Sequence, residues 1–210
     1  MPKTTRKARH KSEKHRDLTT AQAILAVVEE ICAERGPMSI QLGEVAEQLG
    51  IETPAIYRHY KGTKGVIGAF AKVALNAEIE TFKGIENLPF EGALLTQAER
   101  MFDLYAMRPG IGRFLMADLS APGGLSGFEN EENLALAREL FALEQDLHQR
   151  GLHSGALREM SFTAFLAART GPSLFGFAFN ELLSNRWTTD IDTLKQDFLE
   201  TVKRLLVQKN

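Results

Sequence analysis

QLGEVAEQLGIETPAIYRHYKGTK, residues 41–64, is the stretch that decides the fold of this 210-residue chain. Its first half carries apolar side chains at the spacing of one helix face, namely Leu42, Val45, Ala46 and Leu49. Gly50 ends that helix, because glycine enters the left-handed conformation at little cost. Thr53 is expected to cap a second helix that runs from Pro54 to Tyr60, with proline at its first position. Two short helices joined by a glycine turn predict a helix-turn-helix.

The second of these helices divides into a packing side and an outward side. Ile56 and Tyr60 lie one turn apart and are expected to face inward. Between them stand an aromatic ring, a guanidinium and an imidazole, contributed by Tyr57, Arg58 and His59. Arginine can pair bidentately with guanine, and the other two groups suit phosphate oxygens. The outward side therefore has the chemistry of a reader of duplex DNA.

Charge is unevenly distributed along the chain. The net charge is only −2, which alone argues against a nucleic-acid binder. Residues 1–16, however, hold seven Lys or Arg against a single Glu, residues 1–64 sum to +3, and the rest sums to −5. This polarity is typical of an N-terminal part that meets a polyanion. We interpret residues 1–17 as a basic flexible arm, which is either a solvated terminus or a source of phosphate or minor-groove contacts.

The remaining apolar pattern predicts an all-α fold of about nine helices, because no stretch alternates convincingly with period two. Besides the two helices above, the expected helices cover about residues 20–36, 64–82, 91–107, 111–119, 129–150, 155–184 and 190–206. Thr19 or Thr20 opens the first, Thr63 caps the one from residue 64, and Gly151 ends the one from residue 129. Two domains follow: a helix-turn-helix domain over residues 18–64 and a larger helical domain over residues 65–210.

Residues 155–184 are apolar on nearly every side, with an expected break at Gly171-Pro172. A helix that is apolar all round must be covered all round. A second copy of the chain is the simplest cover, which predicts a homodimer built from the last two helices. The alternative is a central core helix in a monomer.

Several classes of protein are disfavoured by the sequence. Cys32 is the only cysteine and lies in an apolar stripe, so we expect a core residue in a reducing, cytoplasmic setting. No apolar run is long enough to span a membrane, and the basic N-terminus is too polar for a secretory signal. The loop 122–127 lacks the lysine of a phosphate-binding loop. Glu144 and His148 are one turn apart, but no third metal ligand accompanies them, and we interpret them as a surface pair. We therefore expect no enzyme and no cofactor.

The segments AILAVVEEICAERGPMSI and EVAEQLGIETPAIYRHYKGTKGVIGAF, within about residues 22–70, resemble the TetR-like (tetracycline-repressor-like) family of transcriptional regulators. The resemblance implies a recognition helix in the major groove, a homodimer on a pseudo-palindromic operator, and a small-molecule effector that releases the DNA. The positions that match the family's DNA contacts are Gln41, Thr53, Pro54, Ala55, Tyr57, Arg58, His59, Lys61 and Lys64. Three positions depart from the family pattern, namely Gln41, Gly43 and Thr63, so the phosphate contacts are expected to be rearranged.

An effector site is expected among the helices of the larger domain. The candidate apolar lining is Met101, Phe102, Tyr105, Phe141, Phe165 and Phe175, and the candidate polar contacts are Arg113, His148, Arg169 and Asn180. These residues favour a largely apolar or aromatic effector, anionic if Arg169 faces inward. The same residues could instead be plain core. The alternative functions are a helical protein-interaction module without sequence-specific DNA binding and, less favoured, a small-molecule enzyme.

Overall fold

The computed structural model describes residues 15, 17–120, 129–171 and 190–208. Its elements are α1 (Thr20–Arg35), the short 3-10 helix η2 (Pro37–Ser39), α2 (Leu42–Leu49), α3 (Thr53–Tyr57), α4 (Gly62–Glu80), α5 (Phe90–Met107), α6 (Pro109–Ser120), α7 (Glu131–His153) and α9 (Ile191–Leu206). A further helix covers residues 162–171. Strand pairing within the described residues is limited to one antiparallel bridge between Leu157 and Val207. The all-α prediction of about nine helices is confirmed.

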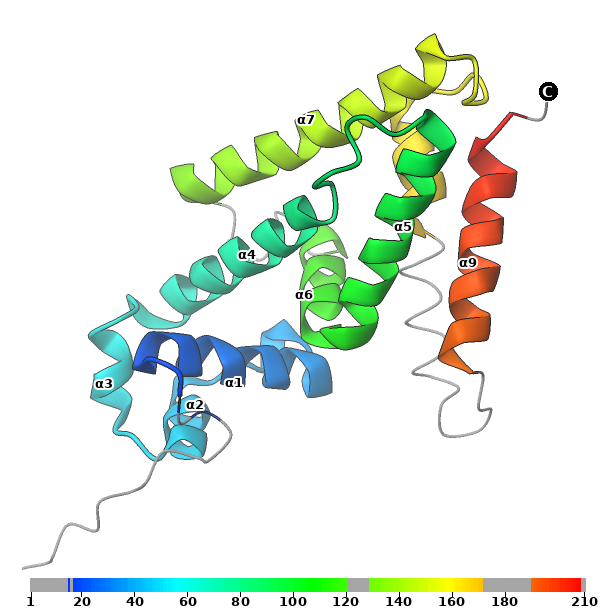
Figure 1. Ribbon diagram of the computed structural model, residues 1–210. Helices are drawn as coiled ribbons and strands as arrows, with labels where there is room; N and C mark the ends of the chain where they lie inside the picture. Colours follow the sequence, from blue (N-terminus) through cyan, green and yellow to red (C-terminus); the bar gives the residue numbers. More distant parts are fainter. Residues whose placement is uncertain (1–14, 16, 121–128, 172–189, 209–210) are drawn as a thin grey trace, which may run out of the picture.

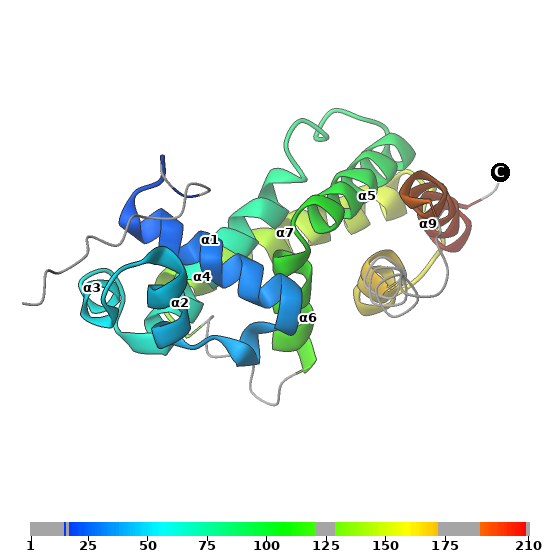
Figure 2. The same ribbon diagram turned by 90° about the horizontal axis from the view of Figure 1, so that it is seen from below.

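The helices separate into two ends (Figure 1). The short helices α2 and α3 gather with α1 at one end, and α9 lies at the opposite end. The view from below keeps the same order, with α3 and α9 far apart (Figure 2). Between the two ends, α4 packs along α7, and α5 packs against α9. Within the described residues, no helix is both long and apolar enough to cross a membrane.

Helix α1 begins and ends as the sequence predicts. The Thr19 side chain accepts a hydrogen bond from the Gln22 N–H, and the Gln22 side-chain oxygen accepts one from the Thr19 N–H, which forms a capping box. Gly36 ends the helix with a positive φ of 81°. Cys32 is fully buried, and burial, with the nearby charge of Glu29, raises its pKa to about 12. A thiol in this environment is part of the core and not a nucleophile.

The helix-turn-helix end packs tightly against the larger part of the chain where α1 meets α6. A Cβ at Gly110 would overlap the Glu29 carbonyl oxygen, so only glycine allows α6 to approach α1 this closely. Arg108 holds the Glu29 carboxylate with two bonds, Nε to Oε1 at 2.9 Å and Nη2 to Oε2 at 2.5 Å. The helix-turn-helix end is therefore anchored to the rest of the chain.

Three predicted helix boundaries are wrong. Glu52, not Thr53, is the N-cap of α3, and Thr53 is the first helical residue. Helix α4 begins at Gly62, so Thr63 lies inside its first turn and does not cap it. Neither Glu52 nor Lys61, the observed N-caps, makes a side-chain cap bond, so both helices begin without the threonine caps that the sequence suggests. The α3 helix is also shorter than predicted, since it ends at Tyr57.

The prediction that Gly151 ends the seventh helix is also wrong. Helix α7 continues through Gly151 to His153. A Cβ at this position would lie 2.5 Å from the Phe90 ring, so the glycine is needed for close packing against α5 and not for a helix stop. Asn130 caps the other end of α7, where its side chain accepts a bond from the Asn133 N–H.

Residues 155–161 are not helical, in contrast to the prediction of one apolar segment from residue 155. This connection pairs with the end of α9: the Arg158 N–H donates to Leu206 O at 3.0 Å, and the Gln208 N–H donates to Ala156 O at 2.8 Å. The following helix begins at residue 162. The predicted break at Gly171-Pro172 falls at the limit of the described residues, and the apolar stretch 172–184 lies outside them. Asp190 caps α9 as predicted, by accepting from the Thr193 N–H.

Candidate nucleic-acid interface and buried polar cluster

The turn between α2 and α3 is a Schellman motif. Gly50 has the left-handed φ of 65°, its N–H donates to Glu47 O at 3.0 Å, and the Ile51 N–H donates to Ala46 O at 3.0 Å. This turn closes the end of α2 and sets the direction in which α3 leaves it. The predicted helix-turn-helix geometry is therefore present.

Helix α3 has one anchored side. Ile56 is fully buried, and the Tyr60 hydroxyl just beyond the helix donates to the Ala21 carbonyl of α1 at 3.0 Å. The interpretation of these two residues as packing is confirmed. Burial also raises the pKa of the Tyr60 phenol, so this donor stays protonated at neutral pH.

The other side of α3 faces outward. Tyr57 is 57% exposed, an unusual environment for a large aromatic ring, and Arg58 and His59 are exposed beside it. The other exposed members of the predicted interface are Gln41, Pro54, Lys61 and Lys64, while Thr53 and Ala55 are half-buried. Gln41 is the N-cap of α2 but makes no side-chain cap bond, so its amide is not committed to the helix end. We call the outward residues Tyr57, Arg58 and His59 the α3 face.

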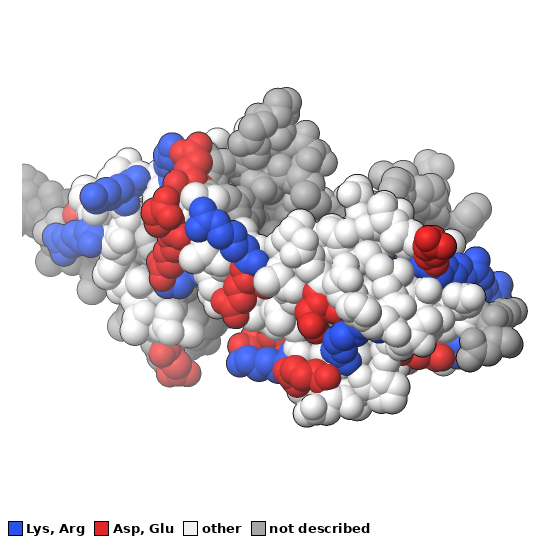
Figure 3. All heavy atoms as spheres, turned by 90° about the horizontal axis from the view of Figure 1, so that it is seen from above, with Lys and Arg blue, Asp and Glu red and all other residues white. Residues whose placement is uncertain are grey.

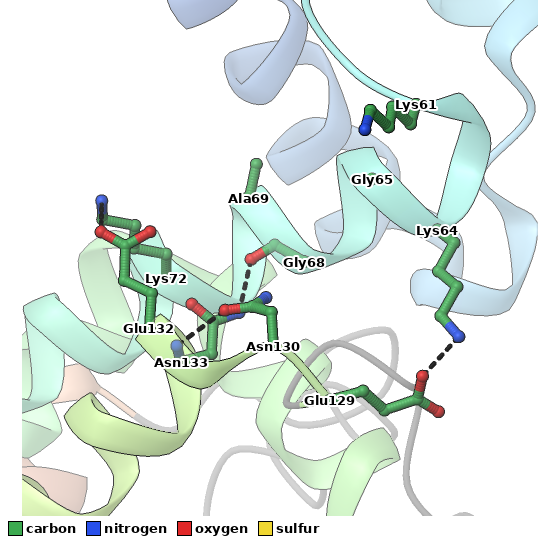
Figure 4. A pocket seen from close by; sticks show the side chains of 10 residues that line it. All are labelled: Lys61, Lys64, Gly65, Gly68, Ala69, Lys72, Glu129, Asn130, Glu132 and Asn133. Atoms are coloured by element: carbon green, nitrogen blue, oxygen red, sulfur yellow. Dashed lines mark hydrogen bonds and ion pairs between the residues drawn. The ribbon is translucent and has the colours of Figure 1, made fainter.

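Lys64 has a partner that sequence reasoning missed. Its ammonium forms an ion pair with Glu129, which lies just before α7 (Figure 4). The same junction of α4 and α7 holds a cleft of about 600 Å³. It is lined by Lys61, Lys64, Gly65, Gly68, Ala69, Lys72, Glu129, Asn130, Glu132 and Asn133. Cationic and anionic side chains also adjoin one another on the face of the molecule seen from above (Figure 3).

The predicted effector residues do not form one group. Met101, Phe102, Tyr105, His148, Phe165 and Arg169 are buried in the larger part of the chain. Phe141 is 48% exposed and packs edge-on against Phe162, with ring centroids 4.9 Å apart. Arg113 lies elsewhere, because its guanidinium donates to the Glu34 carbonyl at the contact between α6 and α1. Phe175 and Asn180 fall outside the described residues.

Charged and polar side chains meet inside the larger part of the chain. Arg169 is fully buried and donates to the Glu144 carboxylate and to the Gln97 amide oxygen. The Tyr105 hydroxyl donates to Glu78, whose charge also acts on Arg169. With His148, these residues form what we call the buried polar cluster, namely Glu78, Gln97, Tyr105, Glu144, His148 and Arg169. The interpretation of Glu144 and His148 as a surface pair is wrong, because α7 turns both side chains into the interior.

Three atoms of this cluster have no hydrogen-bond partner among the described residues. They are Glu144 Oε2, His148 Nδ1 and Arg169 Nε. The His148 Nε2 lies 3.1 Å from the Met160 carbonyl, which can only accept, so Nε2 carries a proton and Nδ1 is the ring nitrogen left without a partner. Buried polar atoms without partners are rare and costly. The cluster therefore offers a carboxylate oxygen, an imidazole nitrogen and a guanidinium N–H to a further hydrogen-bonding group.

Burial also changes the proton affinities within the cluster. Burial raises the pKa of Glu78 above its usual value, although the Tyr105 hydrogen bond and the Arg169 charge oppose it. Burial and the adjacent Glu78 carboxylate raise the pKa of Tyr105 well above its usual value. Burial lowers the pKa of Arg169 to about 10, which still leaves the guanidinium charged at neutral pH. Within the described residues, no set of three acidic, histidine or cysteine side chains could hold a metal ion.

Comparison with known proteins identifies the fold. No family model matches the sequence, and no curated protein matches it either. Solved structures do match. A TetR-family transcription regulator from Marinobacter aquaeolei VT8 superimposes with a TM-score of 0.69 at 16% identity, covering 93% of this chain and 100% of that one. The fold is TetR-like.

Two more solved structures agree over most of the chain. A putative TetR-family regulator from Vibrio parahaemolyticus gives a TM-score of 0.66 at 17% identity, over 90% of this chain and 99% of that one. The regulator FadR from Bacillus subtilis, solved in complex with stearoyl-CoA, gives 0.68 at 17% identity, over 86% and 96%. The TetR-like fold thus extends well beyond residues 22–70, the part in which sequence motifs carry the resemblance.

Proposed function

We propose that this chain is a cytoplasmic, non-enzymatic transcriptional regulator that reads duplex DNA with the α3 face. The observation that carries the proposal is the division of α3: Ile56 and Tyr60 hold the helix to the core, and Tyr57, Arg58 and His59 are left to solvent. Side chains of these three kinds supply base-edge and phosphate contacts. The TetR-like fold supports the same reading, since its solved examples are named as transcriptional regulators.

The proposed active form is a homodimer assembled through the last two helices. Two copies of α3 about 34–36 Å apart would meet successive turns of one face of a duplex, so the operator is a pseudo-palindrome. Apolar side chains on α9 support the interface, because Ile191 and Leu205 are 42% and 44% exposed in the single chain. Occupancy of the operator represses transcription.

The proposed effector is a small molecule that enters the larger domain and releases the DNA. It does so by favouring a conformer in which the two α3 helices have the wrong spacing. The buried polar cluster supports a hydrogen-bonding head group, and the rings of Phe162 and Phe165 beside His148 support an apolar or aromatic body. Glu144 neutralises Arg169, so a net negative charge on the effector is no longer favoured.

The test is selection of a duplex from a random-sequence library, followed by fluorescence anisotropy at two salt concentrations. We expect a selected pseudo-palindromic duplex to bind, with affinity falling about 10³- to 10⁵-fold between 50 and 200 mM salt if six to ten phosphates are contacted. A protein-interaction module without DNA specificity would select no sequence above the starting library. That outcome would refute the proposal.

A further inference from the structure

The Lys64–Glu129 ion pair joins the proposed DNA interface to the larger domain. Lys64 stands in the first turn of α4, directly after the helix-turn-helix, and Glu129 lies just before Asn130, the N-cap of α7. Figure 4 shows the Lys64 side chain extended toward the Glu129 carboxylate at the rim of the α4–α7 cleft. The two side chains are 66% and 55% exposed, so solvent and a bound polyanion can both reach them.

The rest of this junction holds Glu129 within reach of Lys64. Asn133 is almost fully buried, and its side-chain amide donates to the Gly68 carbonyl of α4 at 2.8 Å. Asn130 caps α7 one turn earlier. Further along the two helices, Lys72 pairs with Glu132. The start of α7 is therefore fixed on α4 by contacts that do not involve Lys64.

We propose that Glu129 sets the affinity for DNA by competing with a backbone phosphate for the Lys64 ammonium. The inference rests on the proposed function. An exposed ion pair contributes little stability, so a phosphate can displace the carboxylate. Lysine is a compact charge on a flexible stem, which permits the exchange without movement of α4. Among the described residues, the neighbouring Lys61 forms no ion pair, so its availability to phosphate does not depend on Glu129.

The test compares Glu129→Gln with Glu132→Gln, which removes the matched ion-paired glutamate in the first turn of α7, using the duplex selected for the wild type. We expect Glu129→Gln to bind about two- to fivefold more tightly, because Lys64 no longer has a competing partner. Glu132→Gln should bind like the wild type. Both glutamates are exposed, so neither substitution should affect folding.

A double-mutant cycle separates competition from a general loss of negative charge. In a Lys64→Ala background, Glu129→Gln should have no effect on the affinity. Tightening that persists without Lys64, equal tightening by both glutamine variants, or no tightening by Glu129→Gln would each overturn the inference while leaving the proposed function standing. Failure of the wild type to bind any selected duplex would instead refute both.

Discussion

Arg58 and Arg169 show how differently one residue type is used in the two halves of this molecule. Arg58 is exposed on the α3 face, whereas Arg169 is fully buried, with Glu144 and Gln97 around its guanidinium. An exposed guanidinium keeps its hydration and costs the fold little, so it is free to recognise a partner. A buried guanidinium must be matched by the protein itself. The comparison predicts that changes at Arg58 affect binding and that changes at Arg169 affect folding.

The largest effect is expected at Arg169. Arg169→Met should lower the free energy of unfolding by about 3–5 kcal/mol, because it leaves the Glu144 charge buried without its partner. The matched double variant Arg169→Met/Glu144→Leu should recover most of that loss, since the buried charge is then gone. Urea unfolding monitored by circular dichroism measures both. If the double variant is no more stable than the single one, the free energy of unfolding does not depend on the Arg169–Glu144 ion pair.

The next effect is expected at Arg58. Arg58→Ala should weaken binding of the selected duplex by about 1–3 kcal/mol and relax the preference at one base pair. Its unfolding free energy should stay within about 0.5 kcal/mol of the wild type. Arg138→Ala is the control, because Arg138 is also an exposed arginine and lies on α7, outside the helices of the proposed dimer interface. Equal losses of affinity in the two variants would indicate only a general effect of charge.

Tyr57 and Tyr105 allow the same comparison between an exposed and a buried side chain, here through removal of one hydroxyl group from each. Tyr57→Phe should weaken DNA binding by about 1 kcal/mol through loss of a phosphate contact, without affecting stability. Tyr105→Phe should instead lower stability by about 1–3 kcal/mol, because Glu78 loses its buried donor, and leave DNA affinity unchanged. Anisotropy and urea unfolding of both variants distinguish the roles. An exchange of the two outcomes would contradict the division between the halves.

The smallest effect is expected in the pH dependence of stability at Glu78. Burial raises the pKa of this carboxyl above the unfolded value of 4.5, so the folded state holds the proton more tightly than the unfolded state does. The contribution of Glu78 to stability is therefore complete below pH 4.5 and declines as the pH rises through the folded pKa. Glu78→Gln keeps an acceptor for Tyr105 and should remove this decline. Urea unfolding of both proteins from pH 4 to 8 should show their difference change with pH; a constant difference would contradict the assignment.

The helix-turn-helix end is the part that the sequence predicts best, because its signals are local. The Thr19 capping box, the Gly50 turn and the burial of Ile56 are all encoded within a few residues of the feature they form. Gly151 is a glycine of the kind that often ends a helix, yet it lies inside α7. A glycine is needed there because the Phe90 ring of another helix occupies the space that a Cβ would fill. Local patterns cannot report such a contact.

The buried polar cluster shows even more clearly what local sequence patterns cannot predict. The three side chains that meet at its centre, Gln97, Glu144 and Arg169, come from distant parts of the chain. Arg169 and His148 were predicted as polar contacts, but nothing in the sequence indicates that Glu144 neutralises Arg169. The pairing of Lys64 with Glu129 was missed for the same reason. Tertiary ion pairs require the fold before they can be recognised.

The most direct test of the central claim is a methylation-protection footprint of guanine N7 on the selected duplex, comparing the wild type with Arg58→Ala. If α3 lies in the major groove, the wild type should protect two patches about one helical turn apart. Arg58→Ala, at concentrations that saturate the duplex, should lose protection at one guanine in each patch, because arginine covers that atom when it pairs with guanine. An identical pattern for the two proteins, or no protection in the major groove, would contradict the account.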